Sequence, residues 1–118
     1  MDLRVRRIYE SPDESDGWRI FVDRLWARGL SKEKSKLDLW IKEIAPTTEL
    51  RKWYGHDPEK FEEFRRRYFE ELDANPKAEE FANRLAGTEG TVTLLCGAKD
   101  VSHSNAAVLK EWLERRIR

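Results

Sequence analysis

Residues 91–96 (TVTLLC) form an unbroken run of β-branched and apolar residues, and this run constrains the fold more than any other segment. A strand that is apolar on both faces needs cover on both faces, which is typical of a parallel sheet with helices packed against it. We therefore expect residues 91–96 to be a strand buried on both sides. A loop at residues 97–104 then leads to a final helix that turns Leu109 and Leu113 inward.

The first half of the chain contains three further strand candidates. Residues 3–9 alternate in character, and residues 18–25 (WRIFVDRL) are apolar enough for a central strand, with a loop of turn-forming residues at 11–17 between them. Residues 37–44 (LDLWIKEI) fit either a strand or one face of a helix. We favour the strand because residues 45–47 (APT) form a clean stop.

Helices are expected in the middle of the chain. Thr47 or Thr48 can cap a short helix that ends near Gly55. Asp57 can cap a longer helix, with Pro58 in its first position. Its apolar residues recur at helical spacing as far as Leu72, and a shorter helix follows the stop at residues 75–76. Strand, helices, strand and helix in this order predict a single α/β domain over residues 1–118, with a small, mostly parallel sheet of about four strands flanked by helices in a Rossmann-like, three-layer arrangement.

Composition bounds the class of protein. Apolar and charged residues each make up 39% of the chain, and 23 basic side chains balance 23 acidic ones. This balance argues against a dedicated nucleic-acid binder, which normally has a basic excess. A single cysteine excludes an intrachain disulfide and a CxxC zinc site. No segment is apolar for long enough to span a bilayer, and no signal-peptide core is present, so we expect a cytoplasmic location.

Three stretches carry a resemblance to a known family. They are residues 22–31 (VDRLWARGLS), residues 45–58 (APTTELRKWYGHDP), and residues 94–100 (LLCGAKD) followed by His103. Together they resemble the domain-of-unknown-function family numbered 488, in its short YeaO-like branch, over nearly the whole chain. Ala27 stands where that branch commonly has proline, and Asn105 stands where a second histidine often follows the first. The resemblance implies a fold and no established activity. Longer relatives carry a Cys-His-Arg after the last strand, which this chain lacks.

The loop after residues 18–25 is the first candidate site, because ligands of open α/β sheets bind beyond the carboxyl ends of the strands. Arg24 and Arg28 flank Trp26 in this loop. Two guanidinium groups can hold a phosphate or carboxylate, and the indole offers a flat face to a ring. The alternative is that Arg24 pairs with Asp23 or another acid while Trp26 belongs to the core.

The loop after residues 91–96 is the second candidate. Lys99 supplies charge, Asp100 lies beside it, and His103 can exchange a proton near neutral pH. Exposed backbone N–H groups at the start of the last helix would favour an anion, although ordinary capping by serines explains the same residues. If the two loops lie side by side, they form one basic pocket.

The leading hypothesis is a small-ligand protein, or an enzyme, that acts on an anionic compound such as a phosphate or nucleotide-like molecule. Arg24, Trp26, Arg28, Lys99 and Asp100 would line the site, with Asp23 and His103 as candidates for proton transfer. No motif implies a cofactor or a metal site. The alternatives are a protein-interaction domain without catalysis, using exposed aromatic residues, and a nucleic-acid module using the arginines at 4, 6, 7 and 65–67.

Overall fold

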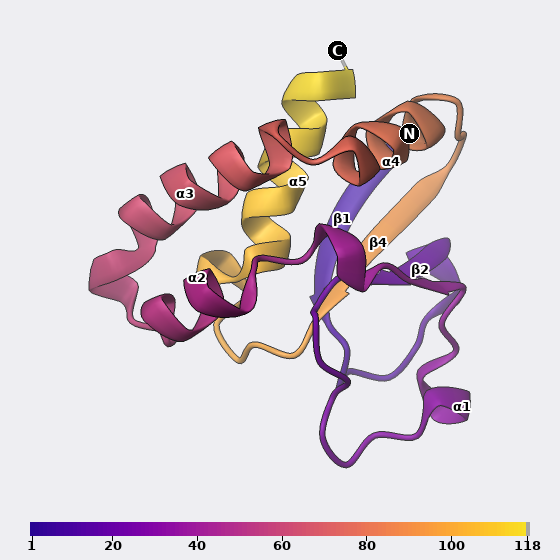
Figure 1. Cartoon of the computed structure of the whole chain (residues 1–118). Helices are drawn as coiled ribbons and strands as arrows, with labels where there is room; N and C mark the ends of the chain where they lie inside the picture. The colour runs from indigo at the N-terminus through magenta and orange to yellow at the C-terminus, as the bar shows by residue number, and fades with distance from the viewer. Residues whose placement is uncertain (118) are drawn as a thin grey trace.

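The computed structural model describes residues 1–117, and its centre is a four-stranded, all-parallel sheet with the strand order β1-β4-β2-β3 (Figure 1). The strands are β1 (Asp2–Arg7), β2 (Trp18–Phe21), β3 (Leu39–Trp40) and β4 (Thr91–Cys96). β4 pairs with both β1 and β2, so the most apolar run of the sequence lies inside the sheet. The predicted α/β class with a small parallel sheet is confirmed.

Helices cover one face of this sheet. The helices of the chain are α1 (Lys32–Ser35), α2 (Thr48–Tyr54), α3 (Phe61–Asp73), α4 (Pro76–Ala86) and α5 (Asn105–Ile117). In Figure 1 the three longest, α3, α4 and α5, lie together on one side, and α5 packs against β1 and β4. Leu94 of the sheet, Tyr68 of α3 and Leu109 of α5 are fully buried in the core between these layers.

The opposite face is covered by the segment between β2 and β3, which carries α1. Phe21 and Leu95 point to this side and are fully buried. The rings of Trp26 and Trp40 pack on Phe21, with centroids 5.1 and 5.8 Å from its own. Successive residues of β4 therefore face different layers, as the period of a strand requires, and the prediction that this strand is buried on both faces is confirmed.

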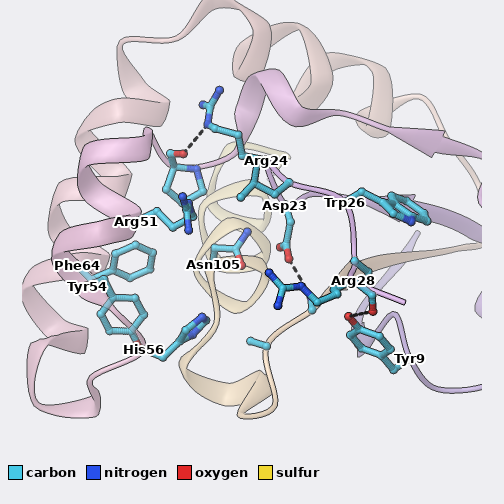
Figure 2. A pocket seen from close by; sticks show the side chains of 15 residues that line it. Tyr9, Asp23, Arg24, Trp26, Arg28, Arg51, Tyr54, His56, Phe64 and Asn105 are labelled. Atoms are coloured by element: carbon cyan, nitrogen blue, oxygen red, sulfur yellow. Dashed lines mark hydrogen bonds between the residues drawn. The ribbon is translucent and has the colours of Figure 1, made fainter. Parts of the chain in front are cut away.

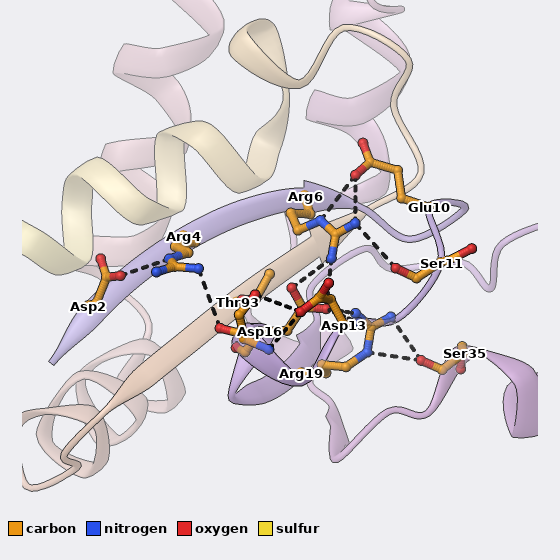
Figure 3. A network of polar contacts seen from close by, with 11 residues as sticks. Asp2, Arg4, Arg6, Glu10, Ser11, Asp13, Asp16, Arg19, Ser35 and Thr93 are labelled. Atoms are coloured by element: carbon orange, nitrogen blue, oxygen red, sulfur yellow. Dashed lines mark hydrogen bonds and ion pairs between the residues drawn. The ribbon is translucent and has the colours of Figure 1, made fainter.

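A buried ion-pair network anchors the loop between β1 and β2 to this second face (Figure 3). Asp16 lies in a short 3₁₀ turn (Glu14–Asp16) and is 1% exposed. Its carboxylate accepts hydrogen bonds from Arg6 at 2.6 and 2.8 Å and from Arg19 at 2.5 Å. The guanidinium of Arg19 also donates to the carbonyl of Ser35, so the network joins β1, β2 and α1.

Two strand predictions were too long. β2 ends at Phe21 instead of continuing to residue 25, and only Leu39 and Trp40 of residues 37–44 form a strand. Beyond Phe21 the side chains of the next residues bond to other loops, which draws the backbone out of the sheet. Beyond Trp40 the chain enters a 3₁₀ turn (Lys42–Ile44), whose last residue is buried in the core.

The predicted helix signals are largely confirmed. Thr47 caps α2 by accepting a hydrogen bond from the N–H of Leu50, and Gly55 ends the helix with a φ of +53°. Asp57 also caps as expected, but the turn it caps is a 3₁₀ turn (Pro58–Lys60), and α3 begins only at Phe61. No helix within residues 1–117 has the length and apolar character that a membrane span requires.

Candidate functional site

The two predicted loops meet in space. β2 and β4 are parallel neighbours, so the loops that follow them lie at the same edge of the sheet. The backbone N–H of Gly97, after β4, donates a hydrogen bond of 2.9 Å to Oδ2 of Asp23, after β2. The indole N–H of Trp40 also donates to the carbonyl of Asp23, at 2.7 Å, which holds the first loop from its other side.

A cavity of about 220 Å³ lies at this edge (Figure 2). The loop of residues 23–28 forms one wall, and Arg51, Tyr54 and His56 from α2 and the turn after it form another. The Tyr54 ring is stacked on that of Phe64, with centroids 4.1 Å apart, which gives the cavity an apolar side.

A second hollow, of about 500 Å³, adjoins this cavity. Arg7, Lys99, Asp100 and His103 line it. The two hollows share five lining residues, which are Tyr9, Tyr54, His56, Gly97 and Ala98. We call the two hollows together the cleft.

Arg24 and Trp26 line the cleft but already have partners. The guanidinium of Arg24 donates to the carbonyls of Pro46 at 3.0 Å and Ala45 at 3.2 Å, and it has no acidic partner among residues 1–117. The indole N–H of Trp26 donates to the carbonyl of Leu30. Its ring packs against the buried residues on the face of the sheet that holds Phe21 and Leu95. The hydrogen bonds of both side chains therefore stabilise the loop itself, independently of any ligand.

Arg28 and Arg51 have freer side chains. Both are exposed, and neither guanidinium forms an ion pair or hydrogen bond with any residue in the described part of the chain. The carbonyl of Arg28, unlike its side chain, is engaged: it accepts a hydrogen bond from the hydroxyl of Tyr9 at 2.9 Å. Arg51 projects from α2 on the opposite wall, so the cavity has a cation without a carboxylate partner on each side (Figure 2).

Asp100 and His103 form a pair at the outer end of the cleft. Nδ1 of His103 lies 2.7 Å from Oδ2 of Asp100, and the hydroxyl of Ser102 donates to Oδ1 of the same carboxylate. The hydrogen bonds from Ser102 and His103 lower the pKa of the Asp100 carboxyl. Lys99 is exposed beside this pair. Asp23 and His103, the two candidates for proton transfer, line different hollows of the cleft.

Asp23 is the carboxyl group at the floor of the smaller cavity. Burial raises the pKa of this carboxyl above its usual value. The hydrogen bond from Gly97, the side chain of Asn105, and the charges of His56 and Arg51 act in the opposite direction but only partly offset the effect. Oδ1 of Asp23 is buried without a hydrogen-bond partner.

Arg51, Tyr54 and His56 are site residues that the sequence analysis did not assign to the site. All three fall in the second stretch of family resemblance, residues 45–58, and that clustering was the available signal. His56 adopts a left-handed φ of +57° directly after Gly55, the residue that ends α2, and it lines both hollows of the cleft. Asp57, its neighbour, is occupied with capping the following turn.

Other candidate chemistry finds little support in the geometry. Cys96 is fully buried, and burial raises the pKa of its thiol to about 11. The arginines at 65, 66 and 67 pair with Glu63, Glu70 and Glu111 on the helix surface. Within residues 1–117 no group of three or more potential ligands is placed to hold a metal ion.

Fold and site together define a small parallel α/β protein with an arginine-lined cleft at the carboxyl edge of its sheet. Over residues 2–118 the chain matches the family model described as "Inactive DUF488-N3 subclade", and it belongs to this family. The predicted family resemblance is therefore confirmed.

Relatives of similar length have sequences similar to this one. An uncharacterized protein of Mycobacterium tuberculosis, Rv3073c, is 42% identical over 114 residues, covering 97% of this chain and 95% of the relative. The uncharacterized protein YeaO of Escherichia coli is 41% identical over 115 residues, covering 96% and 97%. No solved structure matches the chain.

Proposed function

We propose that this protein binds a small anionic compound in the cleft and holds it without converting it. The observation that carries the proposal is which arginines form an ion pair with a carboxylate and which do not. Of the thirteen arginines within residues 1–117, eight form ion pairs with carboxylates. Five do not, and four of these line the cleft: Arg7, Arg24, Arg28 and Arg51.

This division is informative because the chain has enough acidic residues to pair with every cation. The cleft instead collects these four arginines and Lys99 against two carboxyl groups, Asp23 and Asp100. Guanidinium groups that line adjoining hollows without a carboxylate partner repel each other, and an anion relieves this repulsion. Guanidinium groups also match the geometry of phosphate and carboxylate, to which they donate two parallel hydrogen bonds.

The absence of conversion rests on the family and on the side chains at the site. The family description calls the subclade inactive. The buried thiol of Cys96, with its raised pKa, is a poor nucleophile. The imidazole of His103 is engaged by Asp100, at the outer end of the cleft and outside the cavity that Arg28 and Arg51 line.

A protein partner is the second candidate occupant of this edge. Leu25 is 60% exposed and Tyr9 is 39% exposed, and both border the cleft. An acidic peptide could use the same cations and cover these apolar groups. Nucleic acid is less favoured, because Arg4, Arg6 and the arginines at 65–67 already pair with carboxylates.

Thermal unfolding with added anions tests the proposal. Inorganic phosphate, dicarboxylates, sugar phosphates and nucleotides would be added to the native protein and to Arg28→Gln, Arg51→Gln and Arg84→Gln. Arg84 is the matched control, because it has no carboxylate partner within residues 1–117 and lies outside the cleft. A ligand at ten times its Kd adds about 1.4 kcal/mol to the free energy of unfolding. In a domain of this size that raises the midpoint by several degrees, at roughly 4 °C per kcal/mol.

We expect at least one anion class to stabilise the native protein and the Arg84 variant, and to lose most of its effect in the two cleft variants. If no anion raises the midpoint of the native protein, the small-ligand proposal is wrong and a protein partner becomes the better explanation. Equal loss of the effect in the Arg84 variant would show that the anions act through general charge screening and not through the cleft.

A further inference from the structure

The chain contains two histidines, and the structure places both of them at the cleft. His56 lines both hollows, whereas His103 lines only the larger one. In Figure 2 the ring of His56 points from the wall that carries Tyr54 toward the cavity. Imidazole is the side chain whose charge ordinarily changes between pH 5 and pH 8. The histidines therefore lie where the arginines without a carboxylate partner are collected.

The two histidines differ in their contacts. The imidazole of His56 forms no hydrogen bond or ion pair within residues 1–117, and the residue is exposed. In His103, by contrast, Nδ1 lies 2.7 Å from Oδ2 of Asp100, and the ring packs edge-on against Phe61. A protonated His56 thus has its charge and its N–H donors available to a ligand, while the charge of a protonated His103 faces a carboxylate.

The charged and titratable groups that line the cleft with His56 come from four segments of the chain. They are Arg7 and Tyr9 at the end of β1, Asp23, Arg24 and Arg28 after β2, Arg51 and Tyr54 of α2, and Lys99, Asp100 and His103 after β4. Asp57, the next residue in the chain, caps the following turn. Five arginine and lysine side chains therefore face three carboxyl groups, so a further positive charge at His56 is repelled unless an anion is present.

Few of these groups change charge between pH 5.5 and pH 8. Arginine, lysine and tyrosine keep the same charge over this range. Hydrogen bonds from neighbouring side chains lower the pKa of the Asp100 carboxyl, so it stays ionised, and burial raises the pKa of the Tyr54 phenol, so it stays neutral. Burial also raises the pKa of Asp23. Any proton that Asp23 gains as pH falls removes a negative charge, which favours an anion in the same direction as protonation of His56.

We propose that the cleft binds its anion together with a proton carried by His56, so that anion affinity rises as pH falls from 8 to 5.5. This inference rests on the proposed anion-binding function and adds the regulation of that site. The protonated imidazole supplies a positive charge and N–H donors, and it has no acceptor. Since linkage is reciprocal, the anion must increase the affinity of His56 for its proton by the same factor.

Calorimetric titration with sulfate and with ethane-1,2-disulfonate tests this coupling, because neither probe changes its own charge between pH 5.5 and pH 8. Each probe is added at both pH values to the native protein, to His56→Asn and to His103→Asn. Asparagine is uncharged and tolerates the left-handed φ found at position 56, so the turn after α2 can keep its conformation. His103→Asn removes the other histidine of the cleft, which does not line the smaller cavity.

The native protein should bind sulfate at least about fivefold more tightly at pH 5.5 than at pH 8. This is the factor that one added charge about 4 Å from a single anionic charge gives at the dielectric constant of water. His56→Asn should reduce the ratio to below about twofold, and His103→Asn should keep it above about threefold, whatever either substitution does to the affinity itself.

Proton uptake is a readout that a loss of packing would not produce. Titration at pH 7 in buffers of different ionisation enthalpy should show a fraction of a proton bound with each sulfate by the native protein, and almost none by His56→Asn. Proton NMR follows the two imidazoles separately, with the signals assigned from His103→Asn. Sulfate should move the titration of His56 to higher pH by about 0.7 unit, which is the same fivefold factor, and move that of His103 less.

Equal sulfate affinity of the native protein at the two pH values would overturn the inference and leave the anion-binding function standing. A ratio that persists in His56→Asn would also overturn it, because the proton would then belong to Asp23 or His103. If neither probe binds at either pH, the inference is wrong, and the function depends on the phosphates and dicarboxylates of the thermal test. The native ratio and the NMR titration do not need His56→Asn, so they decide the inference even if that variant fails to fold.

Discussion

The N–H of Gly97 donates to Oδ2 of Asp23 over 2.9 Å, and this one bond joins the loops after β4 and β2 into a single wall. A Cβ built on Gly97 would lie 3.2 Å from the same oxygen, so glycine permits the close approach. The bond also places a carboxyl group at the floor of an otherwise cationic cavity. Asp23 is therefore a structural residue and a candidate ligand residue at once, and we expect its charge to affect the free energy of unfolding.

Asp23→Asn should stabilise the protein relative to native more at neutral pH than at acid pH. Burial raises the pKa of Asp23 in the folded state, so its favourable contribution is complete below the unfolded value of about 3.8 and is lost as pH rises through the folded pKa. The amide has no charge to bury and does not suffer this loss. Urea unfolding of both proteins between pH 4 and pH 7 measures the difference.

The free energy gap between Asp23→Asn and native should widen as pH increases. A gap that narrows with increasing pH would mean that the folded pKa is lowered. Asp23→Ala is the companion variant, and it should destabilise at every pH by about 1–3 kcal/mol, because it leaves the N–H of Gly97 unpaired.

Asp16 should show the opposite dependence on pH. Burial acts to raise its pKa, but hydrogen bonds from Arg6, the backbone of Asp13 and Arg19 outweigh this and lower it. Its contribution is therefore present above the unfolded pKa and lost as pH falls through the folded one. Asp16→Ala should cost about 3–5 kcal/mol at neutral pH, since it leaves Arg19, which is 4% exposed, as an uncompensated buried charge.

Asp2→Ala removes an exposed ion pair with Arg4 and should cost less than about 1 kcal/mol. Chemical denaturation at pH 7 and near pH 3 measures the free energy of unfolding of Asp16→Ala and of Asp2→Ala relative to the native protein. Similar losses in both at pH 7 would show that the Asp16 network contributes no more than a surface pair.

The types of the elements could be predicted from the sequence, while the ends of the strands could not. The run at 91–96 and the caps at Thr47 and Asp57 depend on local patterns, and they are found where predicted. β2 ends early because Asp23 and Arg24 bond to Gly97 and to the backbone around Pro46, residues far along the chain. No local pattern reports such partners.

The same distinction holds at the candidate site. Both loops follow strands, so their meeting at one sheet edge could be expected from the fold class. Arg51 lines the cleft because α2 packs against α3 in the layer beside the sheet, which depends on the tertiary arrangement of helices. The free arginines could be recognised only once the ion pairs of the others were known.

Gly17 should be among the least replaceable residues of the chain. It has a φ of +62°, and a Cβ at this position would lie 2.0 Å from the carbonyl oxygen of Thr91 on β4. Gly17→Ala therefore needs a backbone shift beside the central strand, and it should cost more than the roughly 1–3 kcal/mol of a strained φ alone. Gly90 has a φ of +86° with open space around it, so Gly90→Ala isolates the cost of the backbone conformation. Midpoints of thermal unfolding should fall much further for Gly17→Ala, and equal shifts would show that β4 yields without penalty.

Glu71 should affect anion binding without touching the cleft. Its carboxylate accepts hydrogen bonds from the N–H of Thr47 at 3.0 Å and from the Thr47 hydroxyl at 2.7 Å. That hydroxyl in turn caps α2, the helix that carries Arg51. Glu71→Ala releases the cap, so it should destabilise the fold by about 1–2 kcal/mol and weaken anion binding severalfold through a less ordered Arg51.

The neighbouring Glu70 provides the matched control, because it is exposed and its one ion-pair partner within residues 1–117 is Arg66 on the surface of α3. Glu70→Ala should change stability by less than about 1 kcal/mol and leave anion affinity as it is. Glu71→Gln should recover part of the affinity, since the amide oxygen can still accept one of the two bonds from Thr47. If Glu71→Ala loses stability but binds anions with native affinity, the order of α2 does not control Arg51, and that arginine contributes its charge without being positioned.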